Sequence, residues 1–170
     1  LAAMAQSTKV VVTTVGPHLQ FGEPLVAACA TAGTHYCDLT GEPEFVDRMY
    51  TAYHAQAQAS GAKLVHCCGF DSIPHDLGVY YTLQQHARAF GPLAADAQVE
   101  VQGFVRAGGQ FSGGTFHSAM GAFARVREGQ AALKARRELE GYPQGRKIGS
   151  LANKVWFDKA LGTWAIPMPT

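Results

Sequence analysis

The stretch that decides the fold is Lys9–Glu42, with the sequence KVVVTTVGPHLQFGEPLVAACATAGTHYCDLTGE. It begins with the β-branched run Val10–Val15, which has no polar alternation and therefore predicts a strand covered on both faces in a parallel sheet. Gly16-Pro17 ends that strand, because proline removes a backbone donor. Glu23-Pro24 then opens a helix, and Gly33 suits the left-handed position that closes it.

A second strand, Thr34–Leu39, follows this helix and completes a β-α-β unit with an expected right-handed crossover. Ligands of doubly wound sheets bind at the carboxyl ends of the strands. Those ends are Thr14–Pro17 and Asp38–Glu42, which together form the first candidate site. Asp38, Thr40 and Glu42 are expected to shape its floor, and capping of the next helix is an equal alternative for Thr40.

The composition is that of a globular protein. The chain has 170 residues, of which 47% are hydrophobic and 16% charged, so it can bury a core of ordinary size. The net charge of +1 gives no electrostatic argument for nucleic acid. The basic cluster Lys134–Arg137 is interpreted as a solvated helix face. No run approaches the ~20 apolar residues of a membrane helix.

The four cysteines, Cys29, Cys37, Cys67 and Cys68, lie inside apolar helix or strand patterns without C-x-x-C spacing. This pattern indicates reduced, buried thiols of a cytosolic protein. His66-Cys67-Cys68 is not expected to bind a metal ion, because neighbouring residues on a strand point to opposite faces.

The chain after Glu42 repeats the alternation of helix and strand. A helix is predicted from Pro43 to Gly61, a third buried strand over Lys63–Cys68 and a further helix over His75–Arg88. Gln98–Arg106 then alternates apolar and polar residues, which predicts a strand with one solvent-exposed face. Because such a strand does not belong in the same buried sheet, we expect a domain change between Phe70 and Ala97.

The glycine-rich segment Ala107–Gly114 lacks the lysine of a phosphate-binding loop and is interpreted as a mobile strand-to-helix loop. Ser112 or Thr115 would cap the helix that follows it, and Phe116, Met120 and Phe123 would form that helix's core face. The segment from Gly141 onward is only weakly periodic. Both ends of the sequence suggest a piece of a longer protein.

Three motifs together, VTTVGPHLQFGEPLVAACATAGTHYCDLTGE, CGFDSIPHDLGVYY and GGQFSGGTFHSA, resemble the saccharopine dehydrogenase-like oxidoreductases, in particular the trans-acting enoyl reductase branch. The resemblance implies an α/β fold: residues 1–73 as the later part of a Rossmann-like NAD(P)-binding domain, and residues 74–170 as the beginning of an α+β substrate domain. The family's glycine-rich dinucleotide fingerprint is absent from these residues. We therefore expect this stretch of chain alone to bind NAD or NADP weakly or not at all and to be inactive by itself.

Carried onto matching positions, the resemblance places Thr14, Val15, Gly16 and Pro17 along the nicotinamide side of the cofactor. It places Asp71 and Ser72 in the catalytic cleft, and capping of the helix near Pro74 is an equal alternative for both. His75 and His18 are candidate proton donors.

The leading functional interpretation is a nicotinamide-dependent enoyl reductase that acts on a lipid or polyketide-type substrate in lipid or glycolipid biosynthesis. A lysine-pathway saccharopine dehydrogenase is an alternative, for which Arg106, Arg125 and Arg127 could bind substrate carboxylates. A non-catalytic module is a further alternative, with Trp156, Phe157 and Trp164 as a hydrophobic association surface. A cytoplasmic location, peripheral membrane or lipid association and a homodimer complete these expectations.

Overall fold

The computed structural model describes residues 1–106, 108, 113, 125–141 and 154–167, and the statements below concern these residues. The chain forms two compact units, one made of Leu1–Ile73 with Gly109–Tyr142 and the other of Pro74–Gly108 with Pro143–Thr170. The first break thus falls next to the predicted boundary at residue 73, and the chain later returns to the first unit. A cofactor domain followed by a substrate domain stays a prediction.

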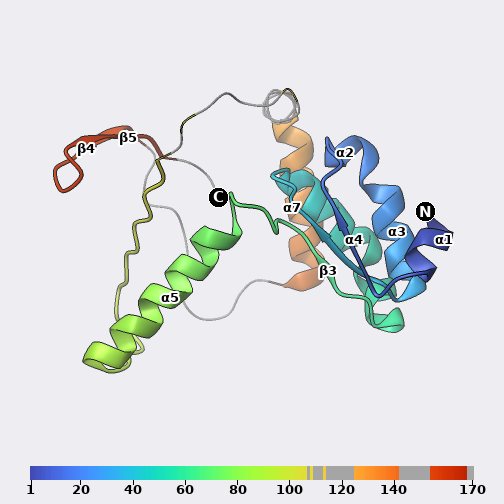
Figure 1. Ribbon diagram of the computed structural model, residues 1–170, viewed down its shortest axis with the longest axis horizontal. Coiled ribbons are helices and arrows are strands. Elements are labelled where there is room, and N and C mark those ends of the chain that lie inside the picture. The colour runs from blue at the N-terminus through green and yellow to red at the C-terminus, as the bar shows by residue number, and fades with distance from the viewer. Residues whose placement is uncertain (107, 109–112, 114–124, 142–153, 168–170) are drawn as a thin grey trace. The chain divides into compact units, whose positions relative to one another are not determined.

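The first unit contains a three-stranded parallel sheet, which confirms the predicted α/β class (Figure 1). Its strands are β1 (Val10–Thr13), β2 (His35–Asp38) and β3 (Leu64–Val65), in the order β1-β2-β3. Each strand is shorter than its apolar run, because the residues beyond it turn to form the loops at the carboxyl edge.

Five helices accompany the sheet: α1 (Ala2–Gln6), α2 (His18–Phe21), α3 (Glu23–Ala32), α4 (Pro43–Ser60) and α7 (Val126–Glu140). Gly33 closes α3 at a φ of 74° and Gly61 closes α4 at 79°. Both angles lie in the left-handed region that favours glycine. The predicted helix ends are therefore confirmed.

The core of this unit lies on one face of the sheet. Because the strand order steps twice in the same direction, right-handed crossovers bring α3 and α4 to the same side. Tyr36, Val26 and Phe45 are buried there, and Val11 packs against them.

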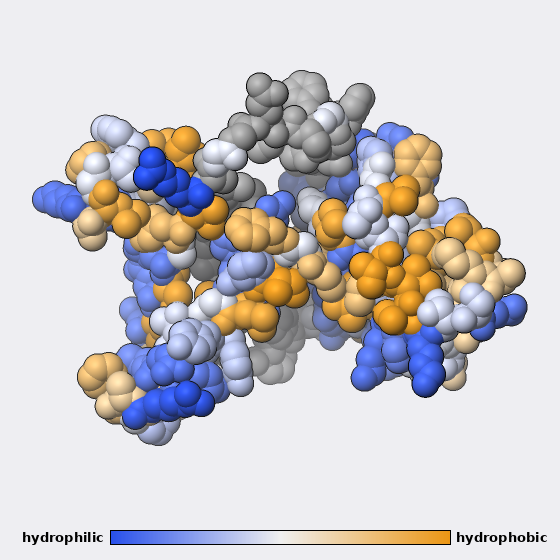
Figure 2. All heavy atoms as spheres, in the orientation of Figure 1, coloured by the Kyte–Doolittle hydropathy of each residue, from blue (hydrophilic) through white to orange (hydrophobic). Residues whose placement is uncertain are grey.

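The other face of β1 is open within the described residues. Val10 is 47% exposed and Val12 71% exposed, and Figure 2 shows hydrophobic side chains gathered over the strands. The prediction that Val10–Val15 is covered on both faces is thus wrong for the described part of the chain. The apolar run correctly indicated that β1 contributes to a core. It could not indicate which face the helices cover, because that depends on the strand order.

Helix α7 packs against α4, and two ion pairs connect them, one from α7 itself and one from Arg125, the residue directly before it. Arg125 Nε lies 3.3 Å from Glu44 Oε2, and Arg136 Nη1 lies 3.0 Å from Asp47 Oδ1. The guanidinium of Arg136 also lies 4.9 Å from the centre of the Tyr50 ring, within cation–π range. The basic cluster Lys134–Arg137 is therefore not simply a solvated face, since Arg136 points into the interface between helices.

Gly22 lies where the α2–α3 corner meets α4. A Cβ on Gly22 would lie 2.6 Å from Phe45 Cζ and 2.8 Å from the carbonyl oxygen of His18. We expect Gly22→Ala to lower the free energy of unfolding by about 1–3 kcal/mol, because the buried ring must move. Gly41→Ala is the control, since its Cβ would meet nothing within 4 Å. Equal urea midpoints for the two variants would contradict this packing.

The second unit contains most of α5 (Ile73–Phe90) and an antiparallel hairpin of β4 (Trp156–Asp158) and β5 (Thr163–Ala165). The hairpin lies in the weakly periodic region, for which no strand was predicted. Gln98–Arg106 is not a strand in the structure, so that prediction is wrong. The alternation of apolar and polar residues fits a strand. A strand forms only where a partner strand supplies backbone hydrogen bonds, and no strand among the described residues pairs with Gln98–Arg106.

The predicted glycine-rich loop and the helix after it, with Ser112, Thr115, Phe116, Met120 and Phe123, lie outside the described residues, except for Gly108 and Gly113. On α5, Leu77, Tyr80 and Tyr81 are exposed. No helix among the described residues is long and apolar enough to cross a membrane.

All four cysteines are free thiols, as predicted, but only Cys29 is fully buried. Cys37, Cys67 and Cys68 are half-buried around the ends of β2 and β3. Burial raises the pKa of the Cys29, Cys67 and Cys68 thiols, which disfavours the reactive thiolate.

Candidate functional site

At the carboxyl edge of the sheet, the buried carboxylate of Asp38, at the end of β2, connects two neighbouring loops. Asp38 is 1% exposed. Its Oδ2 accepts a hydrogen bond from the Tyr36 hydroxyl at 3.0 Å and lies 2.6 Å from His66 Nδ1. Its Oδ1 accepts from the backbone N–H groups of Thr40 and Cys67, each at 3.1 Å. Asp38 therefore fixes the loop after β2 against the loop after β3.

These contacts decide the charge state of the carboxylate. Burial by itself would raise the pKa of Asp38, but the hydrogen bond and charge of His66, with the two backbone donors, hold that pKa below its usual value. The pKa of Tyr36 is raised far above its usual value by burial and by the neighbouring Asp38 charge. The edge thus holds a buried aspartate, paired with His66, beside a neutral tyrosine.

A second buried carboxylate, Glu42, fixes the turn after β1. Its two oxygens accept hydrogen bonds from the backbone N–H groups of His18 at 3.0 Å and Leu19 at 3.1 Å, in the first turn of α2. These N–H groups have no acceptor inside the helix, so the carboxylate satisfies them. Glu42 therefore attaches the Gly16-Pro17 turn to the end of the loop after β2.

The structure gives a defined role to the three predicted floor residues. Asp38 and Glu42 are buried and direct their oxygens at neighbouring loops rather than at an open surface. The hydroxyl of Thr40 accepts the N–H of Glu42, the residue before α4, at 3.2 Å. Helix α4 has no side-chain cap, so Thr40 orders the loop and does not cap the helix.

The predicted cofactor-binding residues lie together on the turn after β1. Thr14, Val15 and Gly16 are exposed, with Val15 at 62%, and Pro17 is half-buried. The hydroxyl of Thr13 accepts the N–H of Val15 at 3.2 Å and so shapes the turn. Thr14–Pro17 therefore presents an open surface next to the anchored start of α2.

The predicted catalytic residues are divided between the two units. Asp71 is exposed and Ser72 half-buried in the turn before α5, at the end of the first unit, and the Ser72 N–H donates to the Gly69 carbonyl. His75 is half-buried and belongs to the second unit. His18, the other candidate proton donor, is 3% exposed and packs against the Phe45 ring, 5.7 Å between centroids. Catalytic roles for Asp71, Ser72 and His75 stay predictions.

Sequence reasoning missed His66 as a functional candidate. Its ring is held by Asp38, 28 residues earlier, and packs edge-on against Phe45 at 5.4 Å between centroids. The available signal was its position directly after the third strand, at the same edge as Asp38. Among the described residues, no group of three or more His, Cys, Asp or Glu side chains could hold a metal ion.

The first unit is thus an α/β sheet of the Rossmann-like class, with a buried polar network at the carboxyl ends of its parallel strands. A trans-acting enoyl reductase of Mycobacterium bovis is 58% identical to this chain over 80 residues, 47% of the chain and 19% of the relative. A Mycobacterium tuberculosis protein that also carries the name trans-acting enoyl reductase is 53% identical over 119 residues, 69% of the chain and 27% of the relative.

A saccharopine dehydrogenase-like oxidoreductase of Arabidopsis thaliana is 33% identical across 100% of this chain and 37% of its own length. The chain therefore belongs to the saccharopine dehydrogenase-like oxidoreductase family, which confirms the resemblance in the motifs. It spans between 19% and 37% of the length of these relatives. No protein-family model matches it, and no solved structure matches it.

Proposed function

We propose that the whole protein is an oxidoreductase that uses NADP or NAD and reduces the activated double bond of a lipid or polyketide-type substrate, in lipid or glycolipid biosynthesis. The names of the mycobacterial relatives support the reaction class. One structural observation supports the proposal at the level of residues. The exposed Thr14–Pro17 turn, anchored by Glu42 at the carboxyl edge of the sheet, contains a glycine at a position where the packing leaves room for a Cβ.

The space around Gly16 supports a cofactor role. A Cβ on Gly16 would lie 3.5 Å from His18 Nδ1, an ordinary van der Waals contact, so packing does not explain the absence of a side chain. Glycine does allow a flat ring to approach the backbone. Next to it, exposed Val15 offers an apolar surface. These residues fit the nicotinamide end of the cofactor.

The bound cofactor would supply the hydride. The residues of this chain would do the rest: Thr14–Pro17 orient the ring, and Glu42 keeps that turn in place. Asp71, Ser72 and His75 are the proposed catalytic residues, with His75 as a candidate group that holds the proton for the substrate carbon.

The test is Gly16→Val in the full-length protein. We expect it to weaken NADPH or NADH binding at least about 10-fold, because the branched side chain occupies the place of the ring. Gly103→Val is the control, since Gly103 is exposed, lies outside the candidate site and has open space around it. Cofactor dissociation constants and melting temperatures are measured on the same preparations. If Gly16→Val lowers the melting temperature and leaves cofactor affinity unchanged, the turn is structural and the proposal loses its residue-level support.

A lysine-pathway saccharopine dehydrogenase activity is the second candidate, favoured by the Arabidopsis relative that matches the whole chain. Its substrate carboxylates would need cations, and of the three candidates Arg125 is engaged by Glu44. Arg106 and Arg127 are exposed. The near-ultraviolet absorbance of NAD(P)H separates the two candidates: consumption of NAD(P)H with an enoyl thioester supports the reductase, and formation of NAD(P)H with saccharopine supports the dehydrogenase.

A non-catalytic association role is supported only by the hairpin, where Trp164 is 67% and Phe157 48% exposed. Trp156 is half-buried. Peripheral membrane or lipid association and a homodimer would both use such a surface. If neither substrate changes the NAD(P)H absorbance and lipid vesicles retain the protein, this role replaces the enzymatic one.

A further inference from the structure

A pocket of about 370 Å³ opens between α4 and β3 in the first unit. Its volume lies within the range of ~300–1,000 Å³ that is typical of small-molecule sites. None of the predicted cofactor-binding or catalytic residues lines it. The pocket is therefore separate from the site proposed above.

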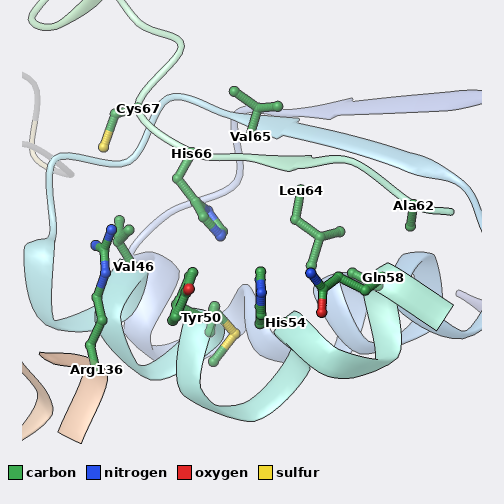
Figure 3. Close-up of a pocket in the computed structure, with 12 residues that line it drawn as sticks. Val46, Tyr50, His54, Gln58, Ala62, Leu64, Val65, His66, Cys67 and Arg136 are labelled. Carbon is green, nitrogen blue, oxygen red and sulfur yellow. The ribbon is translucent and has the colours of Figure 1, made fainter. Parts of the chain in front are cut away.

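The walls of the pocket are mainly apolar, with few polar groups. Val46 and Met49 from α4 and Leu64 from β3 supply hydrophobic surface. His66 and Arg136 supply hydrogen-bonding groups at one end of the pocket. Figure 3 shows the His66 side chain pointing from the end of β3 toward α4, and the Arg136 side chain extending from α7 beside Val46. An apolar cavity with a few placed polar groups is the usual form of a ligand site.

His66 is held in a fixed orientation inside this pocket. Its Nδ1 lies 2.6 Å from Asp38 Oδ2, and Asp38 is itself fixed by the Tyr36 hydroxyl and two backbone N–H groups. The Asp38 bond uses Nδ1, so Nε2 is the nitrogen that remains for a ligand. With Nδ1–H directed at Asp38, a neutral ring accepts a hydrogen bond at Nε2 and a charged ring donates one. A hydroxyl group can serve as partner in both states.

The charges around the pocket do not favour an anion. The only cation on its wall among the described residues, apart from histidine, is Arg136. Arg136 is engaged by two carboxylates, Asp47 at 3.0 Å and Glu140 at 2.9 Å. Its positive charge is therefore compensated, and the two carboxylates, which do not themselves line the pocket, leave no net positive charge at Arg136 to attract an anionic ligand.

The side of the pocket formed by α4 suits an aromatic ligand. The rings of Tyr50 and His54 stack at 4.5 Å between centroids with 22° between their planes, and they rise from α4 toward β3 (Figure 3). Stacked rings that point into a space present their edges to it. Because ring edges are electropositive, they favour contact with the electron-rich face of another aromatic ring.

We propose that the pocket between α4 and β3 binds a neutral aromatic molecule with one hydroxyl group, which forms a hydrogen bond with His66 Nε2 while its ring lies against the edges of Tyr50 and His54. The compensated charge of Arg136 selects against the corresponding carboxylate.

The experiment titrates the protein with 2-naphthol, 2-naphthoate and 2-methylnaphthalene, and follows binding by ligand-observed NMR and calorimetry. We expect 2-naphthol to bind saturably and about 3- to 10-fold more tightly than 2-methylnaphthalene, the effect of one hydrogen bond. Tighter binding of 2-naphthoate than of 2-naphthol, or no saturable binding of 2-naphthol, would overturn the proposal.

Two alanines provide a matched pair of variants. Ala62 lines the pocket, whereas Ala59 is an exposed residue of α4 that does not. Ala62→Phe should fill the pocket and weaken 2-naphthol binding at least about 10-fold, and Ala59→Phe should leave it unchanged. Equal affinities in the two variants would place the ligand elsewhere and contradict the assignment.

His66→Phe tests the hydrogen bond itself. It should abolish the preference for 2-naphthol over 2-methylnaphthalene while 2-methylnaphthalene still binds; a retained preference would show that His66 is not the partner. Because this variant also removes the hydrogen-bond partner of Asp38 Oδ2, its fold is checked by circular dichroism. If it is unfolded, the Ala62 and Ala59 variants and the ligand series decide the outcome.

Discussion

Asp38→Ala is expected to lower the free energy of unfolding by about 3–5 kcal/mol, the cost typical of breaking a buried charge pair. The substitution leaves the Tyr36 hydroxyl and the N–H groups of Thr40 and Cys67 without their acceptor, and it leaves the His66 ring without its carboxylate. Each buried donor without a partner costs about 1–3 kcal/mol. A single substitution would thus remove four contacts.

Urea unfolding followed by circular dichroism measures this loss. Asp71→Ala is the matched control, because Asp71 is exposed and exposed positions usually change stability by less than about 0.5 kcal/mol. Asp38→Asn should fall between the two, since an amide keeps one oxygen for the backbone donors. Similar urea midpoints for Asp38→Ala and Asp71→Ala would show that the network contributes little.

The same carboxylate predicts how stability depends on pH. Since the pKa of Asp38 is lower in the folded state than in the unfolded state, its contribution is complete above the ordinary aspartate pKa of about 3.9. It is lost as the pH falls through the lowered folded-state pKa. Asp38→Asn should therefore flatten the acid limb of the stability profile, and an unchanged acid limb would contradict the assignment.

Glu42→Ala is expected to cost about 2–4 kcal/mol, because two N–H groups at the start of α2 lose a charged acceptor. Glu42→Gln keeps one oxygen and should lose roughly half as much. Glu138→Ala is the control, since that side chain is 68% exposed in its pair with Lys134.

In the full-length protein, the Glu42 variants should also weaken NAD(P)H binding if the Thr14–Pro17 turn holds the cofactor. The folded fraction is measured with the affinity, so that loss of binding is separated from loss of fold. Glu42→Ala protein that is folded and binds the cofactor normally would remove Glu42 from the proposed positioning role.

The parts of the fold that local chemistry determines could be predicted from the sequence. Gly33 and Gly61 end their helices because only glycine adopts the left-handed angle easily, and that preference does not depend on distant residues. The Thr14–Pro17 turn follows from an apolar run and a proline. The open face of β1 could not be predicted in this way, because it depends on the order of the strands and the side of each crossover.

Asp38 was predicted at the carboxyl edge of the sheet, but its pairing with His66 was not. Asp38 and His66 lie 28 residues apart, and neither has a neighbour in sequence that indicates the pair. Their contact follows from the adjacent positions of β2 and β3, which only the three-dimensional register establishes. The same applies to Arg136, whose basic neighbours suggested solvent although Asp47 lies 3.0 Å away.

The discontinuous first unit has a consequence for synthesis on the ribosome. Helix α4 ends at Ser60, but α7, which supplies Arg136 to its acidic side, begins only at Val126, directly after Arg125, the other cation on that side. At translation rates of about 5–20 residues per second, α4 would leave the exit tunnel roughly 3–13 s before its cover arrives. During that interval the nascent chain exposes Tyr50 and Asp47, so these residues are available to a chaperone before they are available to α7.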